Sequence, residues 1–183
     1  MDNNRDSQGK TNEYVTYVEM TSLEQLIAGR PPSRATELGI QAPPAPELSE
    51  SLYKAVGGDW RWSDRLPWGR KEWSDYVLRP DVETWTLLVE ETMAGYAEFI
   101  VHDDNSVEIA QFGLVPDFIG QGLGGHMLTL AVEQAWRKRP SRVWLHTSNF
   151  DHPHALENYQ ARGFRIFKKE TLTDYSAEQP PAE

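Results

Sequence analysis

The fold is decided by Phe112-Gly-Leu-Val-Pro-Asp-Phe-Ile-Gly-Gln-Gly-Leu-Gly-Gly-His126. Residues 107–115 are expected to form a β-strand that stops at Pro116, and residues 122–139 a helix with its apolar side chains on one face. The helix begins among four glycines, Gly120, Gly122, Gly124 and Gly125. The N–H groups that open a helix lack intrahelical partners and carry the positive end of its dipole, and glycines leave them open to a phosphate. The stretch therefore predicts a pyrophosphate cradle at a strand-to-helix turn.

Two other phosphate loops and a packing explanation compete for these glycines. A P-loop needs Lys and then Ser or Thr after its last glycine, whereas His126-Met127 follow here. The dinucleotide fingerprint fits Gly120, Gly122 and Gly125, but it belongs to a unit of parallel strands, and the strand here ends an antiparallel meander. Close packing of the turn on a sheet accounts for one or two glycines rather than four within six residues.

The rest of the chain predicts a mixed α/β domain. Strands are expected at 14–18, between the breakers at 29–33 and 42–46, and at 83–90, 94–102, 142–147 and 164–168. Helices are expected at 48–56, around 71–78 and at 154–162. Antiparallel strands leading into a β-α-β-α-β tail make an α+β mixed architecture. Residues 1–12 and 171–183 are polar and unpatterned and are expected to be disordered.

Composition bounds the class of protein. The 183 residues suit a single domain, and 39% of them are hydrophobic. The sequence shows no apolar run long enough for a membrane span and no secretory signal, so a soluble cytoplasmic protein without a membrane partner is expected. There are no cysteines, which excludes disulfides, thiolate metal sites and a cysteine nucleophile. A net charge of −10 argues against a nucleic-acid partner.

The charges are segregated along the chain. Residues 80–110 carry eight acidic residues and no Lys or Arg, whereas residues 132–170 carry eight basic residues and four acidic ones. Two interpretations remain open at this point. These are ordinary solvated faces, or an acidic half faces a cationic substrate while a basic half faces a phosphorylated cofactor.

At this point the turn resembles the central motif of the GNAT acetyltransferase superfamily. That motif is a strand, then Gln/Arg-x-x-Gly-x-Gly/Ala, then a helix, and it is read here as Ile119-Gly-Gln-Gly-Leu-Gly124 with Ile119 as the departure. A second block resembles the family's Asn-x-x-Ala-x-x-x-Tyr-x-x-x-Gly-Phe. Ala155, Tyr159 and Gly163-Phe164 keep its spacing, and His152 stands where Asn is usual. The resemblance covers roughly residues 86–168.

The resemblance implies the GNAT fold, a central mixed and mostly antiparallel sheet flanked by helices. It implies one domain over residues 13–170, with an acceptor-binding half at 13–80 and an acetyl-CoA-binding half at 81–170. Acetyl-CoA would be the co-substrate, with no metal, and its pantetheine arm would pair with the strand at Leu114 and Val115. The remaining cofactor-binding residues would be Gly120, Gln121, Gly122, Gly124, Gly125, His126, His152 and Tyr159.

The resemblance also implies catalytic roles. The N–H of Leu114 would stabilise the oxyanion, a type of contact worth roughly 3–4 kcal/mol. Some members place a catalytic glutamate at the offset of Glu108, fourteen residues before Gly122. Strand alternation puts Glu108 on the side of Phe112, where an apolar cleft would raise its pKa; a solvent-facing carboxylate is the alternative. Glu98 is the second candidate base, and a water chain to either carboxylate is the third. Tyr159 would be the general acid for the thiolate, or a packed aromatic.

The acceptor half is rich in tryptophan. Trp60, Trp62, Trp68 and Trp73 fall within fourteen residues, either as a packed core or with one or two of them lining the acceptor pocket. With Glu98, they suggest a small cationic or aromatic amine as acceptor. Four histidines, His126, His146, His152 and His154, raise a metal interpretation, which we set aside because only Asp151 offers a further ligand; this aspartate is expected to cap the following helix.

The function expected from the sequence is therefore direct transfer of an acetyl group from acetyl-CoA to a small-molecule amine in a ternary complex. Two alternatives stay open. One is a CoA-binding regulatory module without turnover, which the departures at Ile119 and His152 favour. The other is an acyltransferase that uses a longer acyl-CoA or an oxygen acceptor. Many related domains dimerise, so a homodimer is a further expectation.

Overall fold

The computed structural model describes residues 12–173, which form one seven-stranded sheet with helices on both faces. The strand order is β2-β3-β4-β5-β6-β1-β7, and every neighbouring pair is antiparallel except β5 and β6. The strands are β1 (Asn12–Met20), β2 (Thr36–Ile40), β3 (Val82–Val89), β4 (Thr92–Val101), β5 (Ser106–Leu114), β6 (Arg142–Ser148) and β7 (Arg165–Thr173). The predicted mixed, mostly antiparallel sheet is confirmed.

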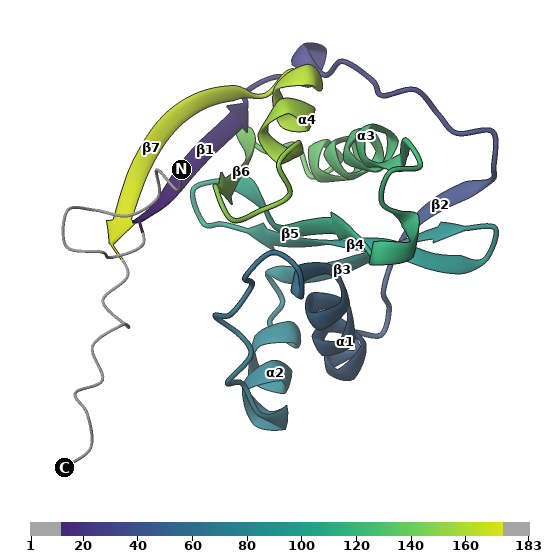
Figure 1. Ribbon diagram of the computed structural model, residues 1–183, viewed down its shortest axis with the longest axis vertical. Coiled ribbons are helices and arrows are strands. Elements are labelled where there is room, and N and C mark those ends of the chain that lie inside the picture. The colour runs from purple at the N-terminus through teal and green to yellow at the C-terminus, as the bar shows by residue number, and fades with distance from the viewer. Residues whose placement is uncertain (1–11, 174–183) are drawn as a thin grey trace, which may run out of the picture.

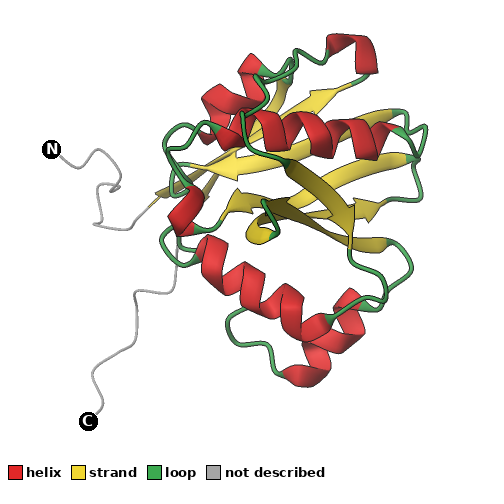
Figure 2. Ribbon diagram, turned by 90° about the vertical axis from the view of Figure 1, so that its right-hand side faces the viewer, coloured by secondary structure: helices red, strands yellow, loops and turns green. Residues whose placement is uncertain are grey.

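The helices cover the sheet from two sides (Figures 1 and 2). In Figure 1, α1 (Pro46–Gly57) and α2 (Arg70–Val77) lie below the sheet, and α3 (Leu123–Trp136) and α4 (Ala155–Ala161) lie above it. Two short 3-10 helices, η1 (Leu23–Gln25) and η2 (Pro116–Phe118), complete the elements and were not expected from the sequence. Among residues 12–173, no helix combines the length and the apolar character that a membrane crossing requires.

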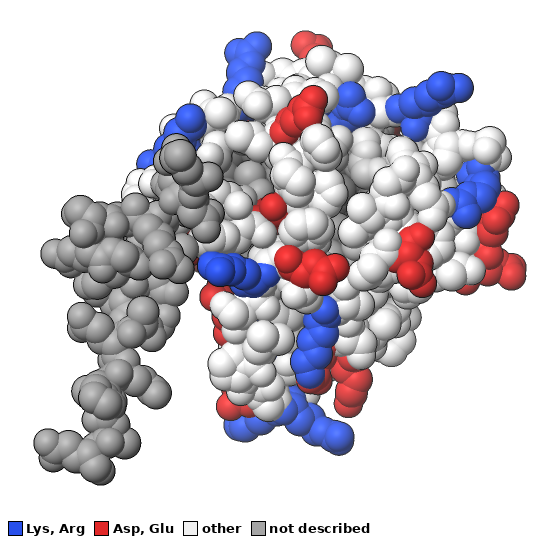
Figure 3. Space-filling view, viewed as in Figure 1, with Lys and Arg blue, Asp and Glu red and all other residues white. Residues whose placement is uncertain are grey.

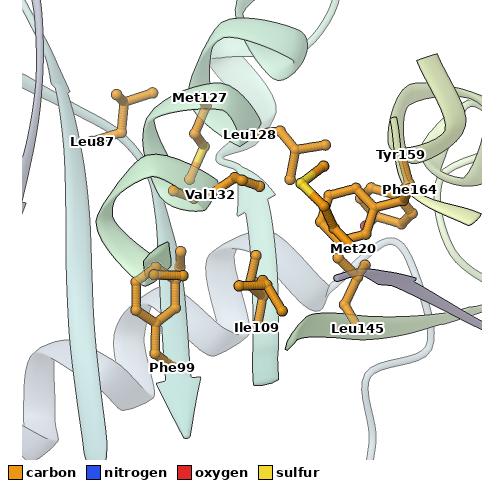
Figure 4. Packing of buried hydrophobic residues seen from close by; sticks show 14 of the residues in the cluster. Met20, Leu87, Phe99, Ile109, Met127, Leu128, Val132, Leu145, Tyr159 and Phe164 are labelled. Carbon is orange, nitrogen blue, oxygen red and sulfur yellow. The ribbon is translucent and has the colours of Figure 1, made fainter. Parts of the chain in front are cut away.

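The main core lies between the sheet and α3. Figure 4 shows Met127, Leu128 and Val132 of α3 facing Ile109 and Phe99 of the central strands, and all five are buried. The helix supplies them because Met127, Leu128 and Val132 recur at helical spacing. This packing fixes the first turn of α3, and with it the glycine turn, against the end of β5.

The first and last strands of the chain, β1 and β7, are longer than the sequence predicted. β1 lies between β6 and β7 (Figure 1). Its register pairs Asn12 with Thr173. Residue 12 and residues 171–173 were expected to be disordered, and the structure corrects this because each chain end completes the ladder of the other. The predicted disorder of 1–11 and 174–183 lies outside the described residues.

The parallel pair at the sheet centre opens part of the way along. β5 and β6 pair only from Ser106 and Arg142 to Glu108 and Trp144, although they continue to Leu114 and Ser148. Beyond Glu108, therefore, the side of β5 that faces β6 has no strand partner there. Unpaired strand edges of this kind take up extended ligands through main-chain hydrogen bonds.

Candidate active site

A cleft of about 440 Å³ lies where β5 and β6 separate. One wall is residues 109–114 of β5, and the opposite wall is Leu145, His146 and Ser148 of β6. The glycine turn and Tyr159 of α4 close one end, and residues 60–64 of the tryptophan-rich loop border the other side. The cleft therefore joins the two motifs found in the sequence, which are about thirty residues apart in the chain.

The glycine turn offers bare backbone to the cleft. Gly120 and Gly122 have φ values of 79° and 75°, which favour glycine, and a Cβ at either position would meet no atom within 4 Å. Gly122 is the N-cap of α3 and no side chain caps that helix, so its first amides keep no partner from a side chain. Gly120, Gly122 and Gly124 all line the cleft. This arrangement suits a diphosphate.

Three of the predicted cofactor residues are engaged elsewhere. Gly125 does not line the cleft, and it leaves room for Arg162, whose Nη1 would lie 2.5 Å from a Cβ there. His126 is half-buried and its Nε2 lies 2.8 Å from Oγ1 of Thr36; burial lowers the pKa of this histidine. The N–H of Val115 donates to the carbonyl of Ala94 at 2.9 Å. These contacts use the side chain of His126 and one amide of Val115, and the role of Gly125, His126 and Val115 in cofactor binding stays a prediction.

The amide of Leu114 points toward the open side of β5. Successive residues of a strand direct their backbone groups to opposite neighbours, and Val115 bonds to the end of β4. The N–H of Leu114 therefore faces the β6 side, where the cleft lies, and Leu114 lines that cleft. This is the orientation that an oxyanion donor requires.

Tyr159 packs its ring in the core and lines the cleft. The ring packs edge-on against Phe112 and Phe164, with centroids 6.2 Å and 6.5 Å away. Among the residues described, its hydroxyl has no hydrogen-bond partner. Burial, with a smaller contribution from Asp151, raises the pKa of Tyr159, so the hydroxyl keeps its proton throughout the neutral range.

Glu108 lies on the other face of the sheet from Phe112. The flanking Val107 and Ile109 belong to the α3 core, and a register irregularity after Glu98 shifts the alternation before Phe112. The expectation that Glu108 and Phe112 share a side was therefore wrong. Glu108 Oε2 lies 2.9 Å from Nε2 of His102, and its Oε1 lies 3.9 Å from Nδ1 of His146, which does line the cleft.

Glu98 is a structural carboxylate. Its side chain is 1% exposed, and both of its oxygens accept hydrogen bonds from Arg65 at 2.8 Å. The hydroxyl of Tyr76 donates to the same carboxylate at 2.6 Å. Burial and the nearby carboxylate raise the pKa of Tyr76, which keeps it a donor. Because Glu98 is buried, accepts three hydrogen bonds and does not line the cleft, the structure corrects it from an acceptor-binding residue and candidate base to a buried anchor.

The tryptophans divide into two groups. Trp60 and Trp62 line the cleft, and Nε1 of Trp62 donates to Asp151 at 3.1 Å. Trp68 packs edge-on against Trp73 at 5.1 Å, in the cluster between α1 and α2, and it does not line the cleft. Trp68 is therefore a packing residue in this structure, and the role of Trp60 and Trp62 in acceptor binding stays a prediction.

His152 and Asp151 lie at the cleft mouth without forming a metal cluster. Asp151 accepts from Thr147 at 2.7 Å and from the amide of Ser148 at 2.8 Å, so it does not cap α4 as expected. The ring of His152 lies 4.9 Å from that of Trp60. Within residues 12–173, no group of three or more His, Cys, Asp or Glu side chains is arranged to hold a metal ion.

Half of the carboxylates in the predicted acidic half form ion pairs with Lys or Arg. The pairs are Asp81 with Arg79, Glu83 with Lys138, Glu98 with Arg65 and Asp104 with Arg142. Figure 3 shows charges of both signs interspersed over one face of the molecule. The negative groups at the cleft are instead Glu13, Asp64 and Asp151. Sequence reasoning missed Glu13 and Asp64, and it missed His146 as a cleft residue, because strand separation decides which side chains line the opening.

Solved structures share this fold. A GCN5-related N-acetyltransferase from Kribbella flavida matches with a TM-score of 0.63 at 19% identity, covering 88% of this chain and 58% of that one. An acetyl-CoA-bound GNAT acetyltransferase from Elizabethkingia anophelis matches at 0.56 and 19%, covering 73% and 78%. An aminoglycoside acetyltransferase from an uncultured soil sample, in complex with trehalose, matches at 0.57 and 12%, covering 81% and 93%. The fold is therefore that of the GCN5-related N-acetyltransferases.

A comparison of the sequence with family models shows the family to which this chain belongs. A family model described as the acetyltransferase (GNAT) family matches residues 49–164, well over half of the chain. This chain belongs to the GNAT acetyltransferase family. No curated protein matches it. It spans about three-fifths of the length of the Kribbella flavida structure.

Proposed function

We propose that this chain transfers the acetyl group of acetyl-CoA directly to the amine of a small acceptor. The observation that carries the proposal is the continuous path from the open edge of β5 to the bare amides of the glycine turn. An extended pantetheine arm can pair with such an edge while the diphosphate lies at the helix entrance. The acetyl-CoA bound to the Elizabethkingia anophelis relative and the CoA bound to an acetyltransferase from Bacillus subtilis agree with this choice of cofactor.

The proposed reaction uses groups at the cleft. The amine nitrogen attacks the thioester carbon, and the N–H of Leu114 stabilises the negative charge on the oxygen. The C–S bond then breaks, and Tyr159 gives its proton to the departing thiolate. The proton lost by the amine goes to Glu108, reached from the cleft through His146 or a water molecule. With no cysteine in the chain, an acyl-cysteine intermediate is excluded, which favours a ternary complex.

The proposed acceptor is a small cationic or aromatic amine. Trp60 and Trp62 provide aromatic faces at the cleft, and Glu13, Asp64 and Asp151 provide negative charge there. In this proposal the segment before β3 binds the acceptor and the segment after it binds the cofactor, within one domain.

Release of free CoA thiol from acetyl-CoA, measured across a panel of amines, tests the proposal. Saturable release that depends on an amine, with double-reciprocal lines that intersect, is the expected result. Parallel lines would contradict direct transfer. Tight CoA binding with no acceptor in the panel would favour a regulatory module, and faster turnover of propionyl- or succinyl-CoA would favour a different acyl donor.

A further inference from the structure

The segment between β1 and β2, residues 21–35, crosses the start of α3, and we call it the strap. It is fastened by main-chain contacts. The N–H of Ile27 donates to the carbonyl of Arg162 at 3.0 Å, and the N–H of Gly29 donates to Oγ1 of Thr129 at 2.8 Å. Gly29 lies so close to the backbone of Gly125 that a Cβ would have no room. The strap therefore has a fixed position beside the glycine turn.

The strap carries Arg34 to that turn and holds it there. Nη2 of Arg34 donates to Oε1 of Gln121, whose Nε2 donates in turn to the carbonyl of Asp117 at 2.7 Å. The guanidinium also lies 5.8 Å from the ring centre of Phe118. Among the described residues, no carboxylate forms an ion pair with Arg34. A guanidinium that no acid neutralises is well suited to bind an anion.

A second hollow lies between the strap and the turn. Arg30, Ser33 and Arg34 line it from the strap, and Gln121 and Gly122 line it from the turn. No acidic residue lines it, whereas Gly122 also lines the main cleft. The two openings therefore meet at Gly122, and the hollow carries two positive charges next to the proposed diphosphate position.

We propose that the strap is a phosphate-binding arm, in which Arg34 and Arg30 bind the 3′-phosphate of CoA. This inference rests on the proposed function. The diphosphate already has the amides of the glycine turn, so the remaining anionic group of CoA is the 3′-phosphate, and Arg matches a phosphate with two parallel hydrogen bonds. The strap lies outside the segment that matches the family model, residues 49–164.

The test compares the binding of CoA and of 3′-dephospho-CoA by calorimetry. Arg34→Gln is expected to weaken CoA binding about tenfold or more, the usual cost of losing one charge-assisted contact, and to leave dephospho-CoA binding unchanged. Arg34→Lys should fall between wild type and Arg34→Gln. Arg30→Gln should give a smaller loss because Arg30 is exposed, and it serves if Arg34→Gln does not fold. Lys71→Gln removes the same charge from α2, where the side chain is 81% exposed, and should change neither affinity.

Three results would overturn the assignment. If Arg34→Gln weakens the binding of both ligands equally, Arg34 contacts the diphosphate and not the 3′-phosphate. If both Arg variants bind CoA as tightly as wild type does, the strap binds no phosphate. If Lys71→Gln weakens CoA binding by the same amount, the effect comes from net charge alone. Wild-type protein that binds neither ligand would instead refute the proposed function itself.

Discussion

Replacement of Arg65 by Met tests the buried ion pair that anchors the tryptophan-rich loop to β4. The variant would leave the carboxylate of Glu98, 1% exposed, with only the hydroxyl of Tyr76 as a donor. Removing one partner of a buried pair costs about 3–5 kcal/mol, and the 10% exposure of Arg65 favours the lower end. A loss of about 3 kcal/mol in the free energy of unfolding corresponds to a fall in Tm of roughly 6–12 °C for a domain of this size.

Urea denaturation of wild type, Arg65→Met, Glu98→Met and the double variant gives the comparison. The double variant should lose less than either single variant, because no buried charge is then left without a partner. Lys54→Met is the matched control; its pair with Glu50 is exposed, so the change should stay below about 1 kcal/mol. Single variants within 1 kcal/mol of wild type, or a double variant that loses the sum of the two, would refute the assignment of Glu98 as an anchor.

Three further predictions concern the site. Tyr159→Phe should lower kcat in the thiol-release assay by a factor of about 10²–10⁴, with little change in Tm. Tyr14 is exposed, so the control variant Tyr14→Phe should leave kcat unchanged in the same assay. Gly122→Ala should fold and should weaken CoA binding in calorimetry; its positive φ should cost about 1–2 kcal/mol of stability. Gly29→Ala should lose about 1–3 kcal/mol of stability because its Cβ would meet backbone atoms. Burial lowers the pKa of His126 in the folded state below its value in the unfolded state. The contribution of the neutral histidine to the free energy of unfolding is therefore complete above about pH 6.5, and it is lost as the pH falls toward the folded-state pKa. Below that pH the unfolding free energy of wild type should therefore fall more steeply than that of His126→Gln; parallel curves would contradict this.

The cofactor side of the fold could be predicted because its signals are local. The glycine turn, its strand and the helix after it are contiguous in the chain, and the structure has each of them within a few residues of the expected bounds. The alignment of Ala155, Tyr159 and Gly163 needed only their spacing along the chain. Tyr159 then reaches the cleft because α4 packs beside the end of β5.

The acceptor side depended on contacts between distant segments. Glu98 is buried because helices cover both faces of β4, and its partner Arg65 comes from a loop that no periodicity predicts. Glu108 faces the opposite side from Phe112 because of one irregularity in the β4–β5 register. The insertion of β1 between β6 and β7 likewise has no signal in the sequence.

The most direct measurement is a calorimetric titration of the wild-type protein with acetyl-CoA. If bare amides beside an unpaired strand edge hold the cofactor, saturable one-to-one binding should appear well below millimolar ligand, and Gly122→Ala should weaken it. Absence of heat at millimolar acetyl-CoA, or identical binding by the glycine variant, would contradict that picture of the cleft.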